Sequence, residues 1–283
     1  MSKQSKTAKD IVNSILKKLP IIIAALIWIA PFYIALVYSF KTKQEIAETL
    51  FSFPKRFYLD NYIKVITENQ AFLRGAKNSI ISTIFTVALL SLFTPMCSYA
   101  LARNFRNRWY NLAYMAFVAA ILIPWQGIMF PLYVNFKALK LTNTLWGYVI
   151  ARTGFQIPIC ILTMTGFVKG IPVELEESAS LEGAGMFRTF WKIVYPLMKP
   201  VNITLLVLNI VFAWNDFSVA LTMLPKGFSR TLPLAQFYYF GDTNQEINLA
   251  FAFFILSMLP IILIYLFCQK HIIRGITSGA VKG

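Results

Sequence analysis

The sequence lacks the short motifs that mark nucleotide, zinc and acyl-transfer sites. It contains no GxxxxGKS or GxxxxGKT run, no HExxH pair and no GxSxG turn, and its single histidine, His271, lies near the C-terminus. Cys97, Cys160 and Cys268 each stand alone in an apolar stretch, without a CxxC pair. This pattern argues against a disulfide framework and against a zinc site, and it favours packing roles for the cysteines. We therefore expect no catalytic centre, no cofactor and no metal in this chain.

Charged residues are also scarce. They make up 14% of the chain, against 57% hydrophobic residues, and the mean hydropathy is +0.60. Soluble proteins carry about 25% charged residues, so a chain with this balance needs lipid to cover its surface. The net charge of +15 would also suit nucleic acid, but no basic patch is interleaved with aromatic residues outside the apolar stretches. Lys and Arg in the short loops of a membrane protein account for the same total.

The apolar stretches are long enough to be membrane spans. The first has no small-residue cleavage pattern, which favours an uncleaved span over a signal peptide, and as a helix it would be about 33 Å long at 1.5 Å per residue. Pro124 and Pro131, on one face of the third stretch, predict a kink. The predicted fold is all-α, a polytopic membrane protein with six transmembrane helices at 19–40, 78–102, 109–136, 143–168, 201–224 and 249–269.

The distribution of Lys and Arg predicts the orientation. Six spans put both termini on one side, and the connector 103–108, on that same side, carries three arginines. Because cytoplasmic loops are enriched in Lys and Arg, we expect both termini to be cytoplasmic. No internal repeat or linker is visible, so we expect one membrane domain with an N-terminal segment 1–71, a core 72–269 and a cytoplasmic tail 270–283.

One polar run, 170–200, interrupts the apolar pattern. Pro172 suits a first helical turn, and three glutamates follow it where negative charge favours a helix N-terminus. Gly183 and Gly185 weaken the helix and let the chain bend, and Pro196 closes the next helical pattern. The run therefore predicts two short helices at an angle, the form of a segment that meets a partner. The alternative is an ordinary amphipathic surface helix between two spans.

The same run resembles the EAA loop of binding-protein-dependent ABC importer permeases. The letters ESASLEGA at 177–184 and IVYPL at 193–197 carry the likeness. The matching residues are Glu177, Ser178, Ala179, Glu182, Gly183, Ala184 and Pro196, with Ser178 in place of the family's first alanine. Further matches extend over 72–283: NS at 78–79, YALAR at 99–103, LTNTLWG at 141–147, WN at 214–215, TLP at 231–233 and the closing GAVKG. Together they resemble the carbohydrate-uptake branch, and within it the maltose-type second permease subunit.

The resemblance implies a multi-pass subunit of a bacterial or archaeal cytoplasmic membrane that imports a sugar, of the di- or oligosaccharide class, by alternating access. Its implied partners are a second homologous permease subunit, two cytoplasmic ABC ATPase subunits that hold ATP and Mg, and an extracytoplasmic solute-binding protein. Hydrolysis of ATP would belong to the ATPase subunits, so this chain would be a non-catalytic transport subunit.

The resemblance also assigns roles to residues. The helix 177–184 would dock into a cleft on the ATPase and transmit its closure to the spans, so we call 170–200 the coupling loop. The tail, with Arg274, Gly275 and Lys282, is expected to reach the ATPase, although a solvated positive-inside tail would look the same. The external loop 225–248 would reach toward the binding protein, although an interfacial aromatic belt is the alternative. Its implied contacts are Thr231, Leu232, Pro233, Phe237, Tyr238 and Tyr239.

Arg152 and Asp216 are charged residues inside predicted spans. Each lies about 14 Å below the outer end of its span at 1.5 Å per residue, and an unpaired charge at mid-depth costs about 2.5 to 3.5 kcal/mol. We expect both to face the interior at one level, either as a pair or as separate polar walls of the sugar pathway with Asn209, Trp214 and Asn215. The alternative is a structural ion pair without substrate contact.

Other functions share some of these features. The EAA loop occurs across importer branches, so a permease for another solute, such as a polyamine or a phosphonate, is the nearest alternative. A self-contained secondary transporter would need ion-coupling residues and paired broken helices. Only Arg152 and Asp216 qualify, and no inverted repeat is visible. A membrane-bound enzyme would need a catalytic cluster, which the sequence lacks.

Overall fold

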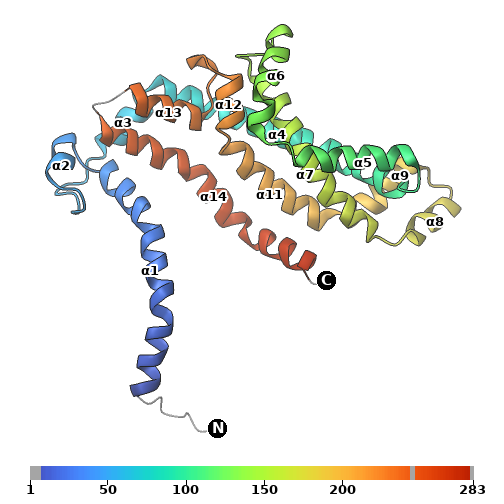
Figure 1. Ribbon diagram of the computed structural model, residues 1–283. Coiled ribbons are helices and arrows are strands. Elements are labelled where there is room, and N and C mark those ends of the chain that lie inside the picture. Colours follow the sequence, from blue (N-terminus) through green and yellow to red (C-terminus); the bar gives the residue numbers. More distant parts are fainter. Residues whose placement is uncertain (1–7, 243–245, 281–283) are drawn as a thin grey trace. The chain divides into compact units, whose positions relative to one another are not determined.

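The computed structural model describes residues 8–242 and 246–280, with side chains for 18–241 and 246–269. Within these residues the regular structure is helical, without a strand. The helices, shown in Figure 1, are α1 Ala8–Ser39, α2 Lys43–Glu48, α3 Asp60–Thr67, α4 Gln70–Arg103, α5 Arg108–Ile121, α6 Trp125–Ala138, α7 Leu145–Lys169, α8 Glu174–Leu181, α9 Met186–Thr189, a π-helical turn Phe190–Val194, α10 Tyr195–Leu197, α11 Lys199–Trp214, α12 Ser218–Met223, a 3-10 turn Gly227–Ser229, α13 Leu232–Asp242 and α14 Ile247–Ala280.

The apolar helices confirm an all-α membrane protein. Four of the described helices are long and apolar enough to cross a bilayer: Lys18–Ser39, Gln70–Arg103, Leu145–Lys169 and Ile247–Gln269. Two bent pairs raise this number to six if each pair is one span. On which side of the membrane the termini lie stays a prediction.

The first bent pair lies where the sequence predicts a kink. α5 and α6 meet at 107°, a sharper break than a proline kink. Pro124 is the residue before α6 and has an extended backbone, so its missing N–H falls where no helical bond is needed. Pro131 lies inside α6, which continues through it. Only one of the two prolines therefore lies at the break between the helices, and it precedes the start of α6.

The second bent pair lies at the end of the coupling loop. The segment Met186–Leu197 meets α11 at 73°. α11 then ends at Trp214 instead of running on to 224, because Asp216 starts the short helix α12 by accepting a hydrogen bond from the N–H of Ala220 at 3.0 Å. The predicted fifth span is thus a helix, a break and a second short helix.

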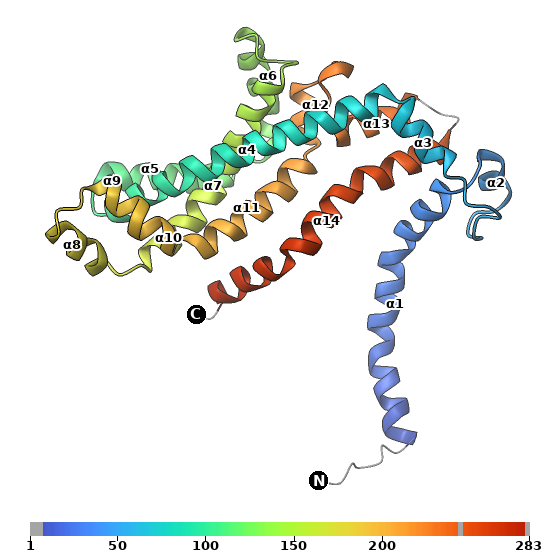
Figure 2. The ribbon, with the colours of Figure 1, turned by 180° about the vertical axis from the view of Figure 1, so that it is seen from behind.

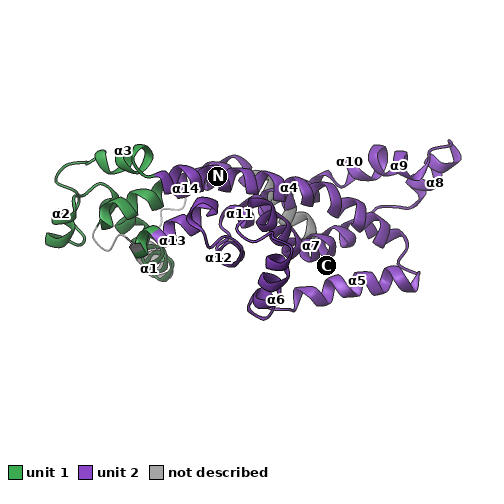
Figure 3. Cartoon of the chain, turned by 90° about the horizontal axis from the view of Figure 1, so that it is seen from above, with its two compact units in different colours: residues 1–69, 239–256 green, residues 70–238, 257–283 purple. Residues whose placement is uncertain are grey.

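By its contacts the chain divides into two units, coloured in Figure 3. One comprises 1–69 and 239–256, and the other 70–238 and 257–283. In the first unit, Asn61 of α3 donates hydrogen bonds to the carbonyls of Ser39 and Lys41, both at 2.9 Å, and so ties α3 to the end of α1. The division of the chain into 1–71, 72–269 and 270–283 stays a prediction.

The second unit is built on α4, α7 and α11, which pack against one another (Figure 2). Small hydroxyl side chains, such as Ser82, Thr94 and Ser98 on α4, are buried in this bundle. Their size lets helix backbones approach closely, which favours association between apolar helices. The Trp214 indole donates to the carbonyl of Ser257 at 3.3 Å and joins the end of α11 to α14.

Candidate functional site

The coupling loop forms the two predicted short helices, and the bend between them depends on Gly183. Its φ of +80° is a left-handed conformation that side chains with a Cβ avoid. The turn is closed by the N–H of Ala184, which donates to the carbonyl of Ala179 at 2.9 Å. Gly185, by contrast, has an ordinary extended backbone before α9. The bend at 182–185 is therefore a defined turn, held by a hydrogen bond and by a glycine in the left-handed conformation.

The turn presents apolar side chains to the surface. Leu181, Met186 and Phe187 are exposed around it, with Leu181 at 90%. Glu177, Ser178, Glu182 and Gly183 are exposed on the same segment, while Ala184 is half-buried. Ala179 is buried within the chain, so it supports the turn and does not form an outer face for docking. Exposed apolar residues beside acidic ones are the composition of a protein-binding surface.

A polar cluster that the sequence analysis missed fixes α8 to α4. The Glu176 carboxylate accepts hydrogen bonds from the Tyr99 hydroxyl and from Nε of Arg103, both at 2.7 Å. Nη2 of Arg103 also lies 2.6 Å from Glu176 Oε1 and donates to the carbonyl of Ile171 at 3.0 Å. The two charged side chains are only 15% and 12% exposed. We call Tyr99, Arg103 and Glu176 the Glu176 anchor.

The returning half of the coupling loop packs into an apolar cluster. Val194 of the π-helical turn, Met198 and Val168 of α7 are fully buried, and Leu205 of α11 is buried beside them. Single π-helical turns often occur at functional sites. Because the cluster joins the loop to two core helices, any displacement of the loop would press directly on α7 and α11. Pro196 lies within α10, next to this cluster, and does not end the helix.

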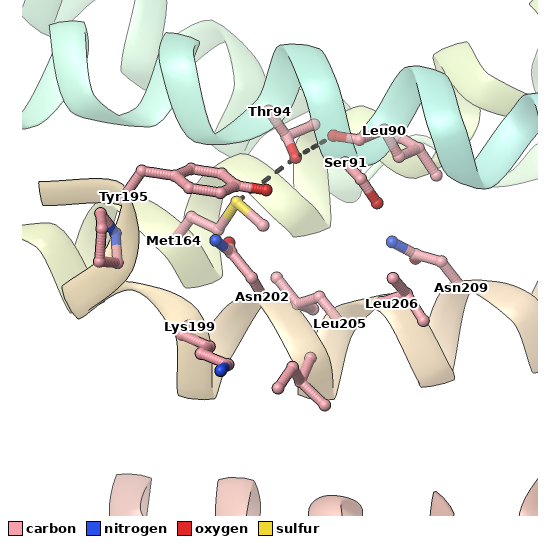
Figure 4. Close-up of a pocket in the computed structure, with 12 residues that line it drawn as sticks. Leu90, Ser91, Thr94, Met164, Tyr195, Lys199, Asn202, Leu205, Leu206 and Asn209 are labelled. Atoms are coloured by element: carbon pink, nitrogen blue, oxygen red, sulfur yellow. Dashed lines mark hydrogen bonds between the residues drawn. The ribbon is translucent and has the colours of Figure 1, made fainter. Parts of the chain in front are cut away.

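A cavity of about 370 Å³ opens beside Pro196, between α4, α7 and α11. Figure 4 shows the Tyr195 ring and the Asn202 amide directed into the space between α4 and α11. Both amide atoms of Asn202 are buried and have no hydrogen-bond partner in the described region of the chain. Asn209, also in the lining, donates to the sulfur of Cys160 at 3.3 Å, which is a weak acceptor. The full lining is Leu90, Ser91, Thr94, Met164, Tyr195, Pro196, Lys199, Asn202, Ile203, Leu205, Leu206 and Asn209.

Arg152 and Asp216 lie together as an ion pair. Nε of Arg152 is 3.6 Å from Oδ1 of Asp216, and the buried Tyr148 donates its hydroxyl to Oδ2 at 3.1 Å. Asp216 also starts α12, so the pair fixes the break after α11 to α7. Of the other predicted pathway residues, Trp214 is buried against α14 and Asn215 is exposed.

The segment 225–238 is held by the opposite end of α4. The Asn78 amide donates to the carbonyls of Phe228 and Arg230 at 3.2 and 2.9 Å, and the Ser79 hydroxyl accepts the Leu232 N–H at 2.8 Å. A Cβ on Gly75 would lie 3.2 Å from the Cβ of Ala235 and from the Cα of Leu232, a tight contact, so glycine favours the close approach there.

The residues predicted to contact the binding protein therefore differ in how far their side chains are exposed. Thr231 and Leu232 are buried, Phe237 is exposed, and Pro233 and Tyr238 are half-buried. Tyr239 belongs to the other unit and is half-buried there. In the tail, Arg274 and Gly275 lie on α14, where side chains are not described, and Lys282 lies outside the described residues.

These features define a class, a helical membrane protein with a built surface turn at one end of its core bundle. Residues 94–278 match the family described as "Binding-protein-dependent transport system inner membrane component", and the chain belongs to this family. The resemblance to binding-protein-dependent permeases is thereby confirmed.

Relatives cover nearly the whole chain. The probable starch degradation products transport system permease protein of Thermoanaerobacterium thermosulfurigenes is 39% identical over 92% of this chain and 94% of its own. The multiple sugar-binding transport system permease protein of Streptococcus mutans is 33% identical over 96% and 98%. A crystal structure of a bacterial ABC transporter involved in alginate import contains a chain of the same fold, with a TM-score of 0.76, 21% identity, and coverage of 95% and 99%.

Proposed function

We propose that this chain is a permease subunit of an ATP-driven importer for a sugar, of the di- or oligosaccharide class, delivered by an extracytoplasmic binding protein. A second permease subunit would complete the pathway, and two separate ATPase subunits would hold ATP and Mg. The names of the two relatives, for starch degradation products and for multiple sugars, support the sugar class. One observation carries the transport role. α4 is bonded to the coupling loop at Arg103 and to the segment 225–238 at Asn78.

These two attachment points would lie on opposite faces of the membrane. Asn78 and Arg103 are separated by about 37 Å along α4 at 1.5 Å per residue, which exceeds the hydrocarbon thickness of about 30 Å. One helix thus contacts both the coupling loop, which would meet the ATPase, and the segment 225–238, which would face the binding protein. In this arrangement closure of the ATPase would displace α8, and the Glu176 anchor would pass the displacement to α4.

The residues of the coupling loop then have separate roles. Glu177, Ser178 and Glu182 would contact the ATPase, with the exposed Leu181 between them. Gly183 and Ala184 set the turn, Ala179 supports it from inside, and Pro196 lies where the loop meets the cavity. The tail, with Arg274, Gly275 and Lys282, would add a further ATPase contact.

On the outer side, Phe237, Pro233 and Tyr238 would contact the binding protein, because they are the accessible members of the predicted set. Thr231 and Leu232 would hold the segment in place from below. Tyr239, in the other unit, would add a further contact.

The cavity would belong to the sugar pathway. Its polar lining consists of amides, hydroxyls and one lysine, and no carboxylate is among its described lining residues. Neutral amides suit the hydroxyl groups of a sugar, whereas a polyamine needs acidic partners. Asn202 and Asn209 are the residues we assign to sugar contact. Arg152 and Asp216, with Trp214 and Asn215, would shape the break that borders this path.

The coupling role is tested with the complete transporter in vesicles. Glu177→Lys or Gly183→Asp is expected to leave the subunit in the membrane and to abolish sugar-stimulated ATPase activity. Glu48→Lys makes the same charge change on the predicted extracytoplasmic side of the membrane. It is the matched control and should retain sugar-stimulated ATPase activity. Retained stimulation in the Glu177 and Gly183 variants would contradict the coupling role.

The substrate class has its own test. Uptake of labelled maltooligosaccharides into the same vesicles is measured with an unlabelled sugar, polyamine or phosphonate as competitor. Only the sugar should inhibit uptake. Inhibition by a polyamine alone would contradict the sugar class but leave the permease role intact.

A further inference from the structure

The segment after α2 carries exposed aromatic side chains that the transport role does not use. We call residues 49–59 the aromatic loop. Phe51 and Phe53 are 68% and 71% exposed, and Leu50, Phe57 and Leu59 are exposed as well. Single exposed apolar residues are common, but a group of five in one short connection marks an interaction surface.

The aromatic loop folds back along the apolar helix α1. The hydroxyl of Tyr33 donates to the carbonyl of Phe51 at 2.9 Å, and the rings of Tyr33 and Phe53 lie 5.8 Å apart. Tyr33 is six residues before the end of α1 at Ser39, which places it about 9 Å below that end at 1.5 Å per residue. Phe51 and Phe53 therefore lie beside the last turns of a membrane span.

The far end of the aromatic loop is attached to the top of the same span. The Tyr58 N–H donates to the carbonyl of Phe40 at 3.0 Å, and the rings of Phe40 and Phe57 lie 5.3 Å apart. Both halves of the loop are thus fixed against α1. Its exposed side chains therefore lie beside the last turns of α1.

A fully buried lysine holds the aromatic loop from inside. The ammonium of Lys41 donates to the Thr49 carbonyl at 2.8 Å, to the Thr49 hydroxyl at 3.2 Å and to the Ser52 hydroxyl at 3.3 Å. The Lys55 N–H donates to the buried Glu45 carboxylate at 2.6 Å. Polar groups are therefore paired on the inner side of the loop, as irregular backbone next to lipid requires. The outer side carries the exposed apolar side chains together with the exposed Lys55 and Arg56.

We propose that the aromatic loop is immersed in the lipid bilayer, at the boundary between headgroups and acyl chains. Aromatic residues are enriched at this boundary because their rings suit its mixed polarity. Arg56, in the same loop, is exposed and placed to meet lipid phosphates, while Lys55 pairs with Glu48 at 3.3 Å. The loop then acts as an interfacial anchor that fixes the height of α1. This inference concerns the membrane and does not depend on the transported solute.

The test uses nitroxide labels on the full chain in vesicles of phosphatidylethanolamine and phosphatidylglycerol. Phe53→Cys and Phe57→Cys are made in a background in which the three native cysteines are alanine. Both positions are exposed, and each change removes one ring contact but leaves the hydrogen bonds from Tyr33 to Phe51 and from Tyr58 to Phe40 that hold the loop. Collision rates with oxygen, which partitions into lipid, and with a water-soluble nickel chelate are compared. We expect oxygen to dominate several-fold at both positions.

Lys43→Cys, an exposed position beyond the end of α1, is the matched control and should be accessible to the nickel chelate. Dominant nickel collisions at positions 53 and 57 would show that the aromatic loop is in water and would overturn the proposal. Protection from both reagents, with or without co-expressed partner subunits, would show a protein-covered surface and would overturn it as well.

Discussion

The Glu176 anchor gives the sharpest prediction. In Arg103→Ala, the Glu176 carboxylate keeps the Tyr99 hydroxyl but loses its cation and two charge-assisted contacts. Removing one partner of a buried pair costs about 3 to 5 kcal/mol. Because these side chains are 15% and 12% exposed, we expect the lower end, about 3 kcal/mol. That is about a hundredfold in the population of a detached α8.

The assay is a double-mutant cycle in the reconstituted transporter. Arg103→Ala and Glu176→Ala should each lower sugar-stimulated ATPase activity without lowering the basal rate. Each should also speed tryptic cleavage at the exposed Arg188 in the coupling loop. The double variant should be no worse than either single one, because the two side chains act as a unit. The exchanged pair Arg103→Glu with Glu176→Arg should recover some of the stimulation.

The matched control is the pair Lys55 and Glu48, whose side chains are 74% and 63% exposed. Exposed ion pairs contribute about 0 to 1 kcal/mol, so alanine at either position should change neither readout. Additive effects of the two anchor substitutions, or unchanged stimulation and cleavage in both single variants, would refute the reasoning.

Three further predictions concern single positions. Gly183→Ala should destabilise the coupling turn by about 1 to 2 kcal/mol, because alanine disfavours the left-handed backbone at this position; a steric clash does not contribute, since the added Cβ would meet open space. Gly185→Ala, at an ordinary extended backbone, should be near neutral, and the rate of tryptic cleavage of the loop measures both. Lys41→Met should leave the Thr49 carbonyl without its donor and lower the midpoint of thermal unfolding by an amount equivalent to about 1 to 3 kcal/mol, with Lys43→Met as the exposed control. Asn202→Leu should raise stability by about 1 kcal/mol, because it removes an unpaired buried amide, and lower sugar uptake; a loss of stability would show that the amide is paired.

Local chemistry was enough to predict much of this arrangement. Charge-free runs of more than twenty residues predicted α1, α4 and α14, because helices satisfy their backbone polar groups internally in lipid. The run 109–136 is equally free of charge but forms the two short helices α5 and α6. Gly183 predicted the bend of the coupling loop, since the turn needs a residue without a Cβ. Both features are set by residues that are close together in the sequence, and they can therefore be predicted from the sequence alone.

Contacts between distant segments could not be predicted in the same way. Glu176 and Arg103 are 73 residues apart, and Asn78 and Arg230 are 152 apart, so neither pair has a local signal. The break after Trp214 was also missed, because the chain becomes apolar again after Asn215 and Asp216 and reads as a continuation of the span. Asp216 starts α12 there only because Arg152 and Tyr148 stabilise its carboxylate inside the core.

The polar ends of α4 explain why these distant contacts matter for transport. In its middle, α4 packs closely against its neighbours through small hydroxyl residues together with Val87 and Leu90. Its two ends, however, are tied by charged or amide side chains to the coupling loop and to the segment 225–238. A displacement applied at Glu176 must therefore either move Asn78 as well or break a hydrogen bond. The EAA-like residues 177–184 mark only the place where the ATPase would act. Under the proposed coupling role, transmission of that movement would depend on Arg103 and Asn78, which lie outside the coupling loop and are 25 residues apart on α4.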